Sequence, residues 1–175
     1  MIKLFEQFNN EQEIREICEK YNIKNYTINP DGSIDVNGDV YISGYRLSKL
    51  PLMFDNVSGD FSCGNNILTT LEGSPKWVGG DFDCHRNNFT SLNGCPIIID
   101  GNLYIEYNQI SLIDISIKVK GNIVFTGCNF DYRIESLSQD KLRILFEHGV
   151  DYNIFDKDGS INNSRLKRMF SDFNI

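Results

Sequence analysis

The chain lacks three features that would point to a membrane, to secretion or to a nucleic acid. Its 175 residues contain no apolar run near the roughly 18 residues of a membrane span. The opening MIKLFEQFNNEQE has no apolar segment ahead of its acidic residues, as a signal peptide would have. Lysine and arginine number 17 against 24 aspartates and glutamates, a net charge of −7, whereas nucleic-acid binders normally carry a basic surface. We therefore expect a cytoplasmic protein that binds neither membranes nor nucleic acids.

The five cysteines lack the spacing of a disulfide framework or of a zinc site. Their number is odd, their spacing is irregular, and the chain contains no CxxC pair. We expect free thiols, no metal and no cofactor.

The sequence does contain a repeat. Residues 58–78 (SGDFSCGNNILTTLEGSPKWV) and 79–99 (GGDFDCHRNNFTSLNGCPIII) align residue on residue at a spacing of about 21. Residues 37–57 form an earlier copy, and residues 100–119 form a later copy that is one residue shorter. Residues 120–130 begin a fifth copy before the pattern ends. Several consecutive copies in register predict a stack of coils.

The copies share residue types at fixed distances from one glycine, with the pattern LxLxxNxLxxL and other apolar residues at some leucine positions. The shared glycines are Gly38, Gly59, Gly80, Gly101 and Gly121. The position two residues after the glycine is apolar, with Val40, Phe61, Phe82, Leu103 and Ile123, and so is the position four residues after it, with Ile42, Cys63, Cys84, Ile105 and Phe125. The position seven residues after the glycine has Tyr45, Asn66, Asn87, Asn108 and Cys128. Alternate residues of a strand share one face, so the apolar pairs predict a core that successive coils share. The asparagines are expected to bond the backbone of adjoining coils where water cannot reach, and Tyr45 departs from this pattern.

The shared glycine lies in the middle of an apolar alternation, as in Ile97, Ile99, Gly101, Leu103 and Ile105. One interpretation is a long bent strand with glycine at the corner, where a side chain would not fit. The alternative takes Asn37-Gly38 as a hairpin turn. The hairpin register would put apolar and polar residues on one face, so we favour the bent strand.

This spacing resembles the leucine-rich repeat, which takes asparagine or cysteine at the seventh-residue position. The resemblance implies an α/β fold: a leucine-rich-repeat-like solenoid of about 21-residue coils with a parallel β-sheet. An open solenoid end needs a cap, and apolar residues at helical spacing in both flanks predict helical ones. We assign residues 1–27 to an N-terminal helical cap, 28–136 to the solenoid and 137–175 to a C-terminal helical cap.

The segments GGDFDCHRNNFTSLNGCP and DGSIDVNGDVYIS resemble the small leucine-rich-repeat-like proteins encoded by tailed bacteriophages. The resemblance implies a protein made in the cytoplasm of a bacterial host, where its partner would be a host or phage protein. It assigns no activity and no catalytic residues.

Polar residues alternate with the core positions and project from the opposite strand face. One column of this face would stack three like charges about 4.8 Å apart, from Asp39, Asp60 and Asp81. Such a stack is unfavourable unless hydrogen-bond donors or a positive charge compensate for the carboxylates. Backbone N–H groups just past the glycine bend could donate hydrogen bonds to the carboxylates, which would be a purely structural role. Alternatively, a bound cation or a basic partner could neutralise them, which would be a functional role. We favour the structural role.

A mixed polar and aromatic cluster on this face is the best candidate for a site, because such surfaces are typical of protein interfaces. Its residues are Tyr41, Asp83, His85, Arg86, Tyr104, Glu106 and Tyr107. The main hypothesis is a non-enzymatic protein-binding module. The alternatives are a structural part of the virion and a small-ligand or metal-dependent enzyme around Asp83, His85 and Glu106. An acid–base group there would lack a nucleophile, because Cys84 alternates inward.

Overall fold

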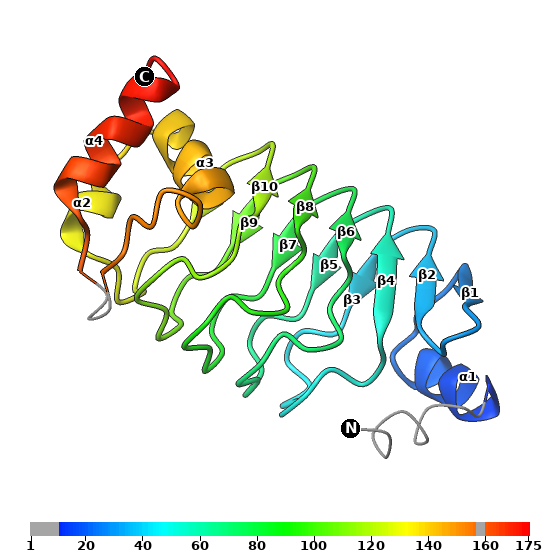
Figure 1. The fold of residues 1–175 in the computed structure, drawn as a ribbon. Coiled ribbons are helices and arrows are strands. Elements are labelled where there is room, and N and C mark those ends of the chain that lie inside the picture. The colour runs from blue at the N-terminus through cyan, green and yellow to red at the C-terminus, as the bar shows by residue number, and fades with distance from the viewer. Residues whose placement is uncertain (1–10, 157–159) are drawn as a thin grey trace.

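A computed structural model describes residues 11–156 and 160–175. It shows a β-solenoid of parallel strands with about four turns of about 21 residues and helices at its ends, which confirms the predicted mixed α/β solenoid (Figure 1). Each coil contributes two short strands. In chain order these pairs are β2 (Ile34–Val36) and β3 (Val40–Tyr41), β4 (Phe54–Val57) and β5 (Phe61–Ser62), β6 (Trp77–Val78) and β7 (Phe82–Asp83), β8 (Ile98–Ile99) and β9 (Leu103–Tyr104), β10 (Lys118–Val119) and β11 (Ile123–Val124).

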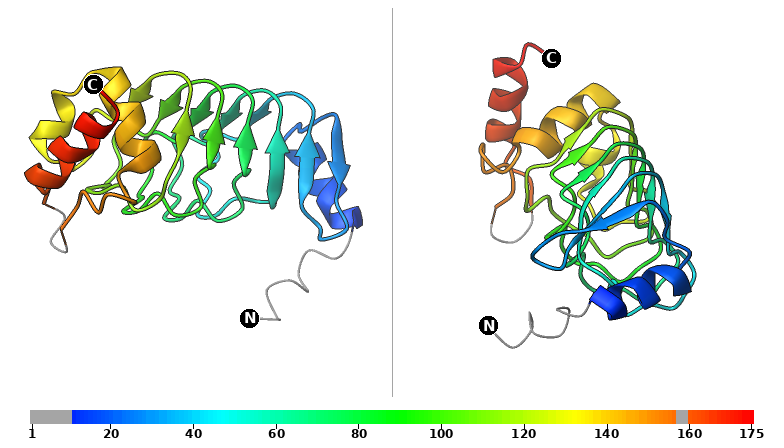
Figure 2. Two further views of the ribbon diagram at one scale, coloured as in Figure 1. Left: turned by 45° about the horizontal axis from the view of Figure 1, so that its top comes forward. Right: turned by 90° about the vertical axis from the view of Figure 1, so that its right-hand side faces the viewer.

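The first strands of the coils form sheet A, in the order β1-β2-β4-β6-β8-β10, and the second strands form sheet B, in the order β11-β9-β7-β5-β3. Equivalent repeat residues pair directly, since Phe61 is in register with Phe82 and Phe82 with Leu103. The rings of Phe61 and Phe82 stack with centroids 5.6 Å apart. Viewed down the axis, the coils superimpose (Figure 2, right). The expected stack with a shared apolar interior is therefore confirmed.

The shared glycine marks the corner between the two sheets, as the bent-strand interpretation predicts. The alternative hairpin at Asn37-Gly38 is wrong, because β2 and β3 belong to different sheets and do not pair with each other. Glycine is needed at this corner because the coils approach closely. A Cβ on Gly80 would lie 2.2 Å from Asp60 Oδ1 and 2.9 Å from the Gly59 carbonyl carbon. No side chain can be placed there without moving the neighbouring coil.

The expected asparagines form a buried ladder along the interior. Asn66, Asn87 and Asn108 are only 7%, 6% and 3% exposed. The Nδ2 of Asn87 donates to Cys63 O of the previous coil and to Cys84 O of its own, both at 3.1 Å. Its Oδ1 accepts from the Leu68 backbone N–H at 3.0 Å. Each ladder asparagine thus satisfies backbone groups of two coils that water does not reach.

The first coil replaces this asparagine with Tyr45, which packs on the N-terminal cap instead. Its ring meets that of Tyr21 edge to face, with centroids 5.0 Å apart. The cap contains helix α1 (Glu11–Lys20), which buries Ile14 and Cys18. Strand β1 (Tyr26–Ile28), which the sequence pattern did not predict, then pairs antiparallel with β2 and covers that edge of sheet A. Residues 1–10 of the predicted cap lie outside the described residues.

The C-terminal end is covered by helices α2 (Tyr132–Glu135), α3 (Gln139–His148) and α4 (Asn163–Asp172). Ser138 is the N-cap of α3, because its side chain accepts from the Lys141 N–H. Gln139 covers the last strand of sheet B. Its Oε1 accepts from the Ile123 N–H at 2.8 Å, and its Nε2 donates to Ile123 O at 3.1 Å. One amide side chain thereby replaces the neighbouring strand that β11 lacks.

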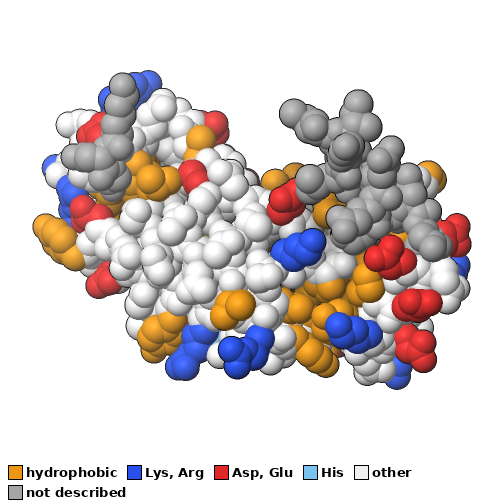
Figure 3. All heavy atoms as spheres, turned by 90° about the horizontal axis from the view of Figure 1, so that it is seen from below, with side chains coloured by type: hydrophobic (Ala, Val, Ile, Leu, Met, Phe, Trp, Pro, Cys, Tyr) orange, Lys and Arg blue, Asp and Glu red, His pale blue; other side chains and the backbone are white. Residues whose placement is uncertain are grey.

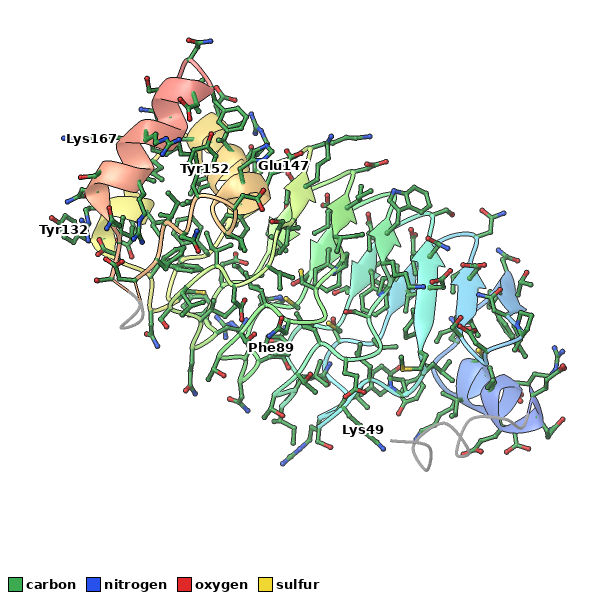
Figure 4. The ribbon with its side chains drawn as sticks, viewed as in Figure 1. Lys49, Phe89, Tyr132, Glu147, Tyr152 and Lys167 are labelled. Atoms are coloured by element: carbon green, nitrogen blue, oxygen red, sulfur yellow. The ribbon has the colours of Figure 1, made fainter. Side chains whose placement is uncertain are left out.

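Irregular segments form the remaining side of each coil. Phe89 points into the interior from this side, whereas Lys49 projects away from it (Figure 4). In the view from below, acidic side chains gather near the N-terminal end, and lysines and arginines are scattered (Figure 3). None of the helices in the described part of the chain has the length and apolarity needed to cross a membrane.

Candidate functional site

The candidate site lies on the outer face of sheet B, which we call the sheet-B face. Strand pairing places Tyr41, Ser62, Asp83, Tyr104 and Val124 side by side in one row across it. These residues alternate with the core positions of sheet B, as predicted for the opposite strand face. Tyr41 is 58% exposed, but Ser62 separates it from Asp83, so Tyr41 lies at the margin of the predicted cluster.

The aspartate column next to the glycine corner is part of the architecture. Asp39, Asp60 and Asp81 each use Oδ1 to accept the backbone N–H that follows the glycine of the next coil, at 2.9, 2.8 and 2.7 Å. Asn102 makes the same bond to the Asn122 N–H at 2.8 Å. The predicted backbone hydrogen bonds therefore join all four pairs of adjacent coils, and a neutral amide replaces the carboxylate without losing them.

Asp83 and His85 form the polar centre of the sheet-B face. His85 Nδ1 lies 2.6 Å from Asp83 Oδ1, and His85 Nε2 lies 2.9 Å from Asn65 Nδ2. Ser62 donates its hydroxyl to Asp83 Oδ2 at 3.1 Å. The ring fits against Gly64, where a Cβ would come within 2.5 Å of His85 Nδ1. Both ring nitrogens are thus engaged by neighbouring side chains, and the imidazole is held in one orientation.

Arg86 and Tyr107 form the second part of the site. The Arg86 guanidinium lies 4.9 Å from the centre of the Tyr107 ring, a cation–π arrangement. The ring rests over Gly127, where a Cβ would lie 2.7 Å from Tyr107 Cδ1. Both side chains are exposed, and that of Tyr107 is 53% accessible. They form a preformed projecting pair at the edge of the sheet-B face.

The backbone of Arg86 and of Tyr107 adopts the left-handed conformation, with positive φ. The residue six places after the corner glycine has positive φ in every coil: Gly44 at 78°, Asn65 at 51°, Arg86 at 50°, Tyr107 at 55° and Gly127 at 75°. We call these five residues the left-handed column. Glycine and asparagine adopt this conformation readily, but other residues do so at a cost of about 1 kcal/mol each. Arg86 and Tyr107 therefore occupy positions that the backbone alone would give to glycine or asparagine.

Tyr104 and Glu106 complete the predicted cluster. Partial burial, followed by the charges of Asp81 and Glu106, raises the pKa of the Tyr104 hydroxyl. Glu106 Oε2 is buried and has no hydrogen-bond partner among the described residues. An unanswered buried carboxylate oxygen on an outer face is rare in folded proteins and calls for an explanation.

The geometry offers an acid–base pair without a nucleophile. Cys84 is fully buried on the opposite side of the strand, and burial raises the pKa of its thiol well above the ordinary value. The Ser62 hydroxyl donates to Asp83 and not to His85. Within the residues that the structure describes, no group of three His, Cys, Asp or Glu side chains is placed to hold a metal ion.

Three residues that shape this site were not predicted from the sequence. Asn65 orients His85, and Gly64 and Gly127 leave the space that the rings of His85 and Tyr107 occupy. A signal was present, since Gly44, Asn65 and Gly127 recur at one offset and are the residue types that favour positive φ. That offset would have predicted the left-handed column, and with it the unusual positions of Arg86 and Tyr107.

Comparison with models of protein families, with curated proteins and with solved structures gives no match to this chain.

Proposed function

We propose that this protein is a non-enzymatic protein-binding module whose partner contacts the sheet-B face around Arg86 and Tyr107. The observation that carries the proposal is the left-handed backbone at these two residues. Stability alone would favour glycine or asparagine there, as in the other three coils. Residues held in a strained backbone conformation cluster at functional sites.

The chemistry of the pair supports the same role. Arginine and tyrosine are enriched among the residues that dominate binding energy at protein interfaces. The cation–π contact, at 4.9 Å, holds both side chains in place before a partner arrives, so little side-chain entropy remains to be lost on binding.

The resemblance to leucine-rich-repeat-like proteins of tailed phages supplies the biological setting of the proposal. In that setting the repeat is of the leucine-rich type, the protein acts in the cytoplasm of the bacterial host, and its partner is a host or phage protein. The rigid solenoid supports this role, because repeat stacks present extended preformed surfaces.

The proposal is tested by capture from a lysate of phage-infected bacteria, with two matched variants. Arg86→Asn with Tyr107→Asn removes both side chains while giving the left-handed backbone a residue that favours it. Lys49→Asn with Ile67→Asn changes two exposed residues outside both sheets. We expect the first variant to lose a specific partner that the wild type and the second variant retain, by mass spectrometry of the captured proteins.

The same partners captured by all three proteins would contradict the proposal. Because Arg86→Asn with Tyr107→Asn relieves the backbone, loss of capture cannot be assigned to unfolding once urea denaturation shows the variant to be at least as stable as the wild type.

A further inference from the structure

The last strand of sheet B has an edge that the fold covers only in part. In every earlier coil, the residues two, four and six places after the corner glycine each donate a backbone N–H to a carbonyl oxygen of the next coil. In the coil before the last, these donors lie 2.9, 2.9 and 3.0 Å from their acceptors and belong to Leu103, Ile105 and Tyr107. The corresponding N–H groups of the last coil, which no coil follows, belong to Ile123, Phe125 and Gly127.

Helix α3 covers only the first of these three N–H groups. Gln139 Oε1 accepts from the Ile123 N–H at 2.8 Å. The N–H groups of Phe125 and Gly127 have no acceptor among the residues that the structure describes. Backbone groups that lack a partner at the edge of a sheet are a site at which another strand can pair.

A groove of about 350 Å³ lies along these two open donors. One wall is the backbone from β11 to Gly127, and the other comes from α2, α3 and the turn between them, which lie beyond the last coil (Figure 1). The residues of this second wall are Glu135, Leu137, Gln139 and Leu142. The volume is at the small end of ligand sites, which span roughly 300–1,000 Å³, and suits a short extended segment beside β11.

The charge of the groove indicates which kind of segment binds there. Glu135 is exposed and forms no hydrogen bond or ion pair with any other described residue. Within the described part of the chain, no lysine, arginine or histidine lines the groove. A basic side chain of a bound segment would therefore be attracted to the Glu135 carboxylate, and an acidic one would be repelled.

We propose that the open edge of β11 binds an extended segment of a partner polypeptide that contains a lysine or an arginine, as an added parallel strand. The repeat gives the register. Carbonyl groups of the segment, two residues apart, accept from the N–H groups of Phe125 and Gly127, as carbonyl groups of the last coil accept from the coil before it. The basic side chain contacts Glu135. The site lies at the rim of sheet B and is independent of the partner proposed for the outer face of that sheet.

A second copy of this chain is a less suitable occupant. The strand with a free side at the other end of sheet B is β3. It contains no basic residue, and the residue before it is the exposed Asp39. Pairing of β3 with β11 would bring a further negative charge to the groove that already contains Glu135.

Amide hydrogen exchange, resolved by residue with NMR, tests whether the edge is open. In the free protein, the amides of Phe125 and Gly127 should exchange more than about tenfold faster than those of Ile105 and Tyr107, which are hydrogen-bonded to the next coil. Equal protection of the two pairs would overturn the proposal, because the edge would then already be covered. Protection that disappears on dilution would assign the edge to a second copy and would also overturn it.

Binding is tested with two pools of blocked heptapeptides of alternating threonine and valine. One pool has a lysine at each position in turn, and the matched pool has a glutamate. At about 1 mM, the lysine pool should slow the exchange of Phe125 and Gly127 severalfold, and the glutamate pool should not.

The charge contact is tested with two variants that make the same change of charge. Glu135→Lys should weaken protection by the lysine pool about fivefold and allow protection by the glutamate pool. Glu72→Lys, at an exposed residue outside both sheets, should leave the preference unchanged. No slowing by the lysine pool, equal slowing by both pools, or a preference that Glu135→Lys leaves intact would overturn the proposed occupant.

Discussion

Two adjacent positions of the repeat differ in burial and in how far their residue types vary from coil to coil. The asparagine ladder contains Asn66, Asn87 and Asn108, and the left-handed column contains the residue immediately before each of them. The ladder is buried and uniform, because each of its amides bonds the backbone of two coils. The left-handed column is mostly exposed and varies among glycine, asparagine, arginine and tyrosine while keeping one backbone conformation.

The difference separates positions whose residue type the fold requires from surface positions whose residue type can serve a function. A buried polar group with a fixed set of partners admits almost no alternative residue. An exposed position with a fixed φ admits any residue whose strain the fold can tolerate. Arg86 and Tyr107 have the less favourable residue types for their backbone, so their side chains are the part of the repeat that the architecture does not explain.

Breaking the ladder should have the largest effect on stability. Asn87→Ala leaves the Leu68 N–H without its side-chain partner in a water-free interior. It also removes one of the two amide donors to Cys63 O and to Cys84 O, which keep only those of Asn66 and Asn108. We expect the free energy of unfolding to fall by about 3 kcal/mol, measured by urea denaturation. The exposed neighbour Asn88 gives the control, since Asn88→Ala should change the free energy of unfolding by less than about 0.5 kcal/mol. Equal effects of the two substitutions would show that the ladder bonds do not stabilise the stack.

Substitutions within the left-handed column should change the free energy of unfolding by a smaller amount. The sign depends on whether asparagine is introduced or replaced. Tyr107→Asn removes about 1 kcal/mol of backbone strain and loses an exposed cation–π contact of about 0.5 kcal/mol, so we expect a net gain of about 0.5 kcal/mol. Asn65→Tyr introduces the same strain and removes the bond to His85 Nε2, so we expect a loss of about 1.5 kcal/mol. Urea denaturation measures both. A loss of stability in Tyr107→Asn would show that the tyrosine is there for packing, and would remove the main support for a binding role.

The same two columns show how far the sequence could predict the structure. The ladder, the inward apolar pairs and the aspartate column follow from period and residue type, because a repeat forces equivalent residues into equivalent contacts. The site depends on details that differ from coil to coil, such as the space that Gly64 leaves for His85 and that Gly127 leaves for Tyr107. Strand β1 was missed because its three residues pair antiparallel outside the repeat, and the amide of Gln139 covers β11 through a contact that no spacing indicates.

An ion pair just beyond the end of the repeat gives an effect that depends on pH. Beyond β11, Asp131 is the N-cap of α2, and its carboxylate accepts from Arg133 Nε at 2.8 Å and from Arg133 Nη2 at 2.5 Å. Hydrogen bonding to the Arg133 side chain lowers the pKa of Asp131 to about 2. An unfolded aspartate titrates near 3.9, so this pair stabilises the fold above about pH 4, and its contribution disappears as the pH falls through about 2.

Asp131→Asn keeps a residue that can cap α2 but removes the titrating group. We expect the melting temperature at neutral pH to fall by a few degrees, with the difference from the wild type closing between pH 4 and pH 2, because only the wild type loses this interaction in acid. Thermal denaturation followed by circular dichroism measures the difference across that range. Asn87→Ala provides the contrast, since the amides of the ladder do not titrate and its deficit should remain constant. A difference between Asp131→Asn and the wild type that stays constant down to pH 2 would show that capping alone, without the Arg133 ion pair, stabilises this end of the solenoid.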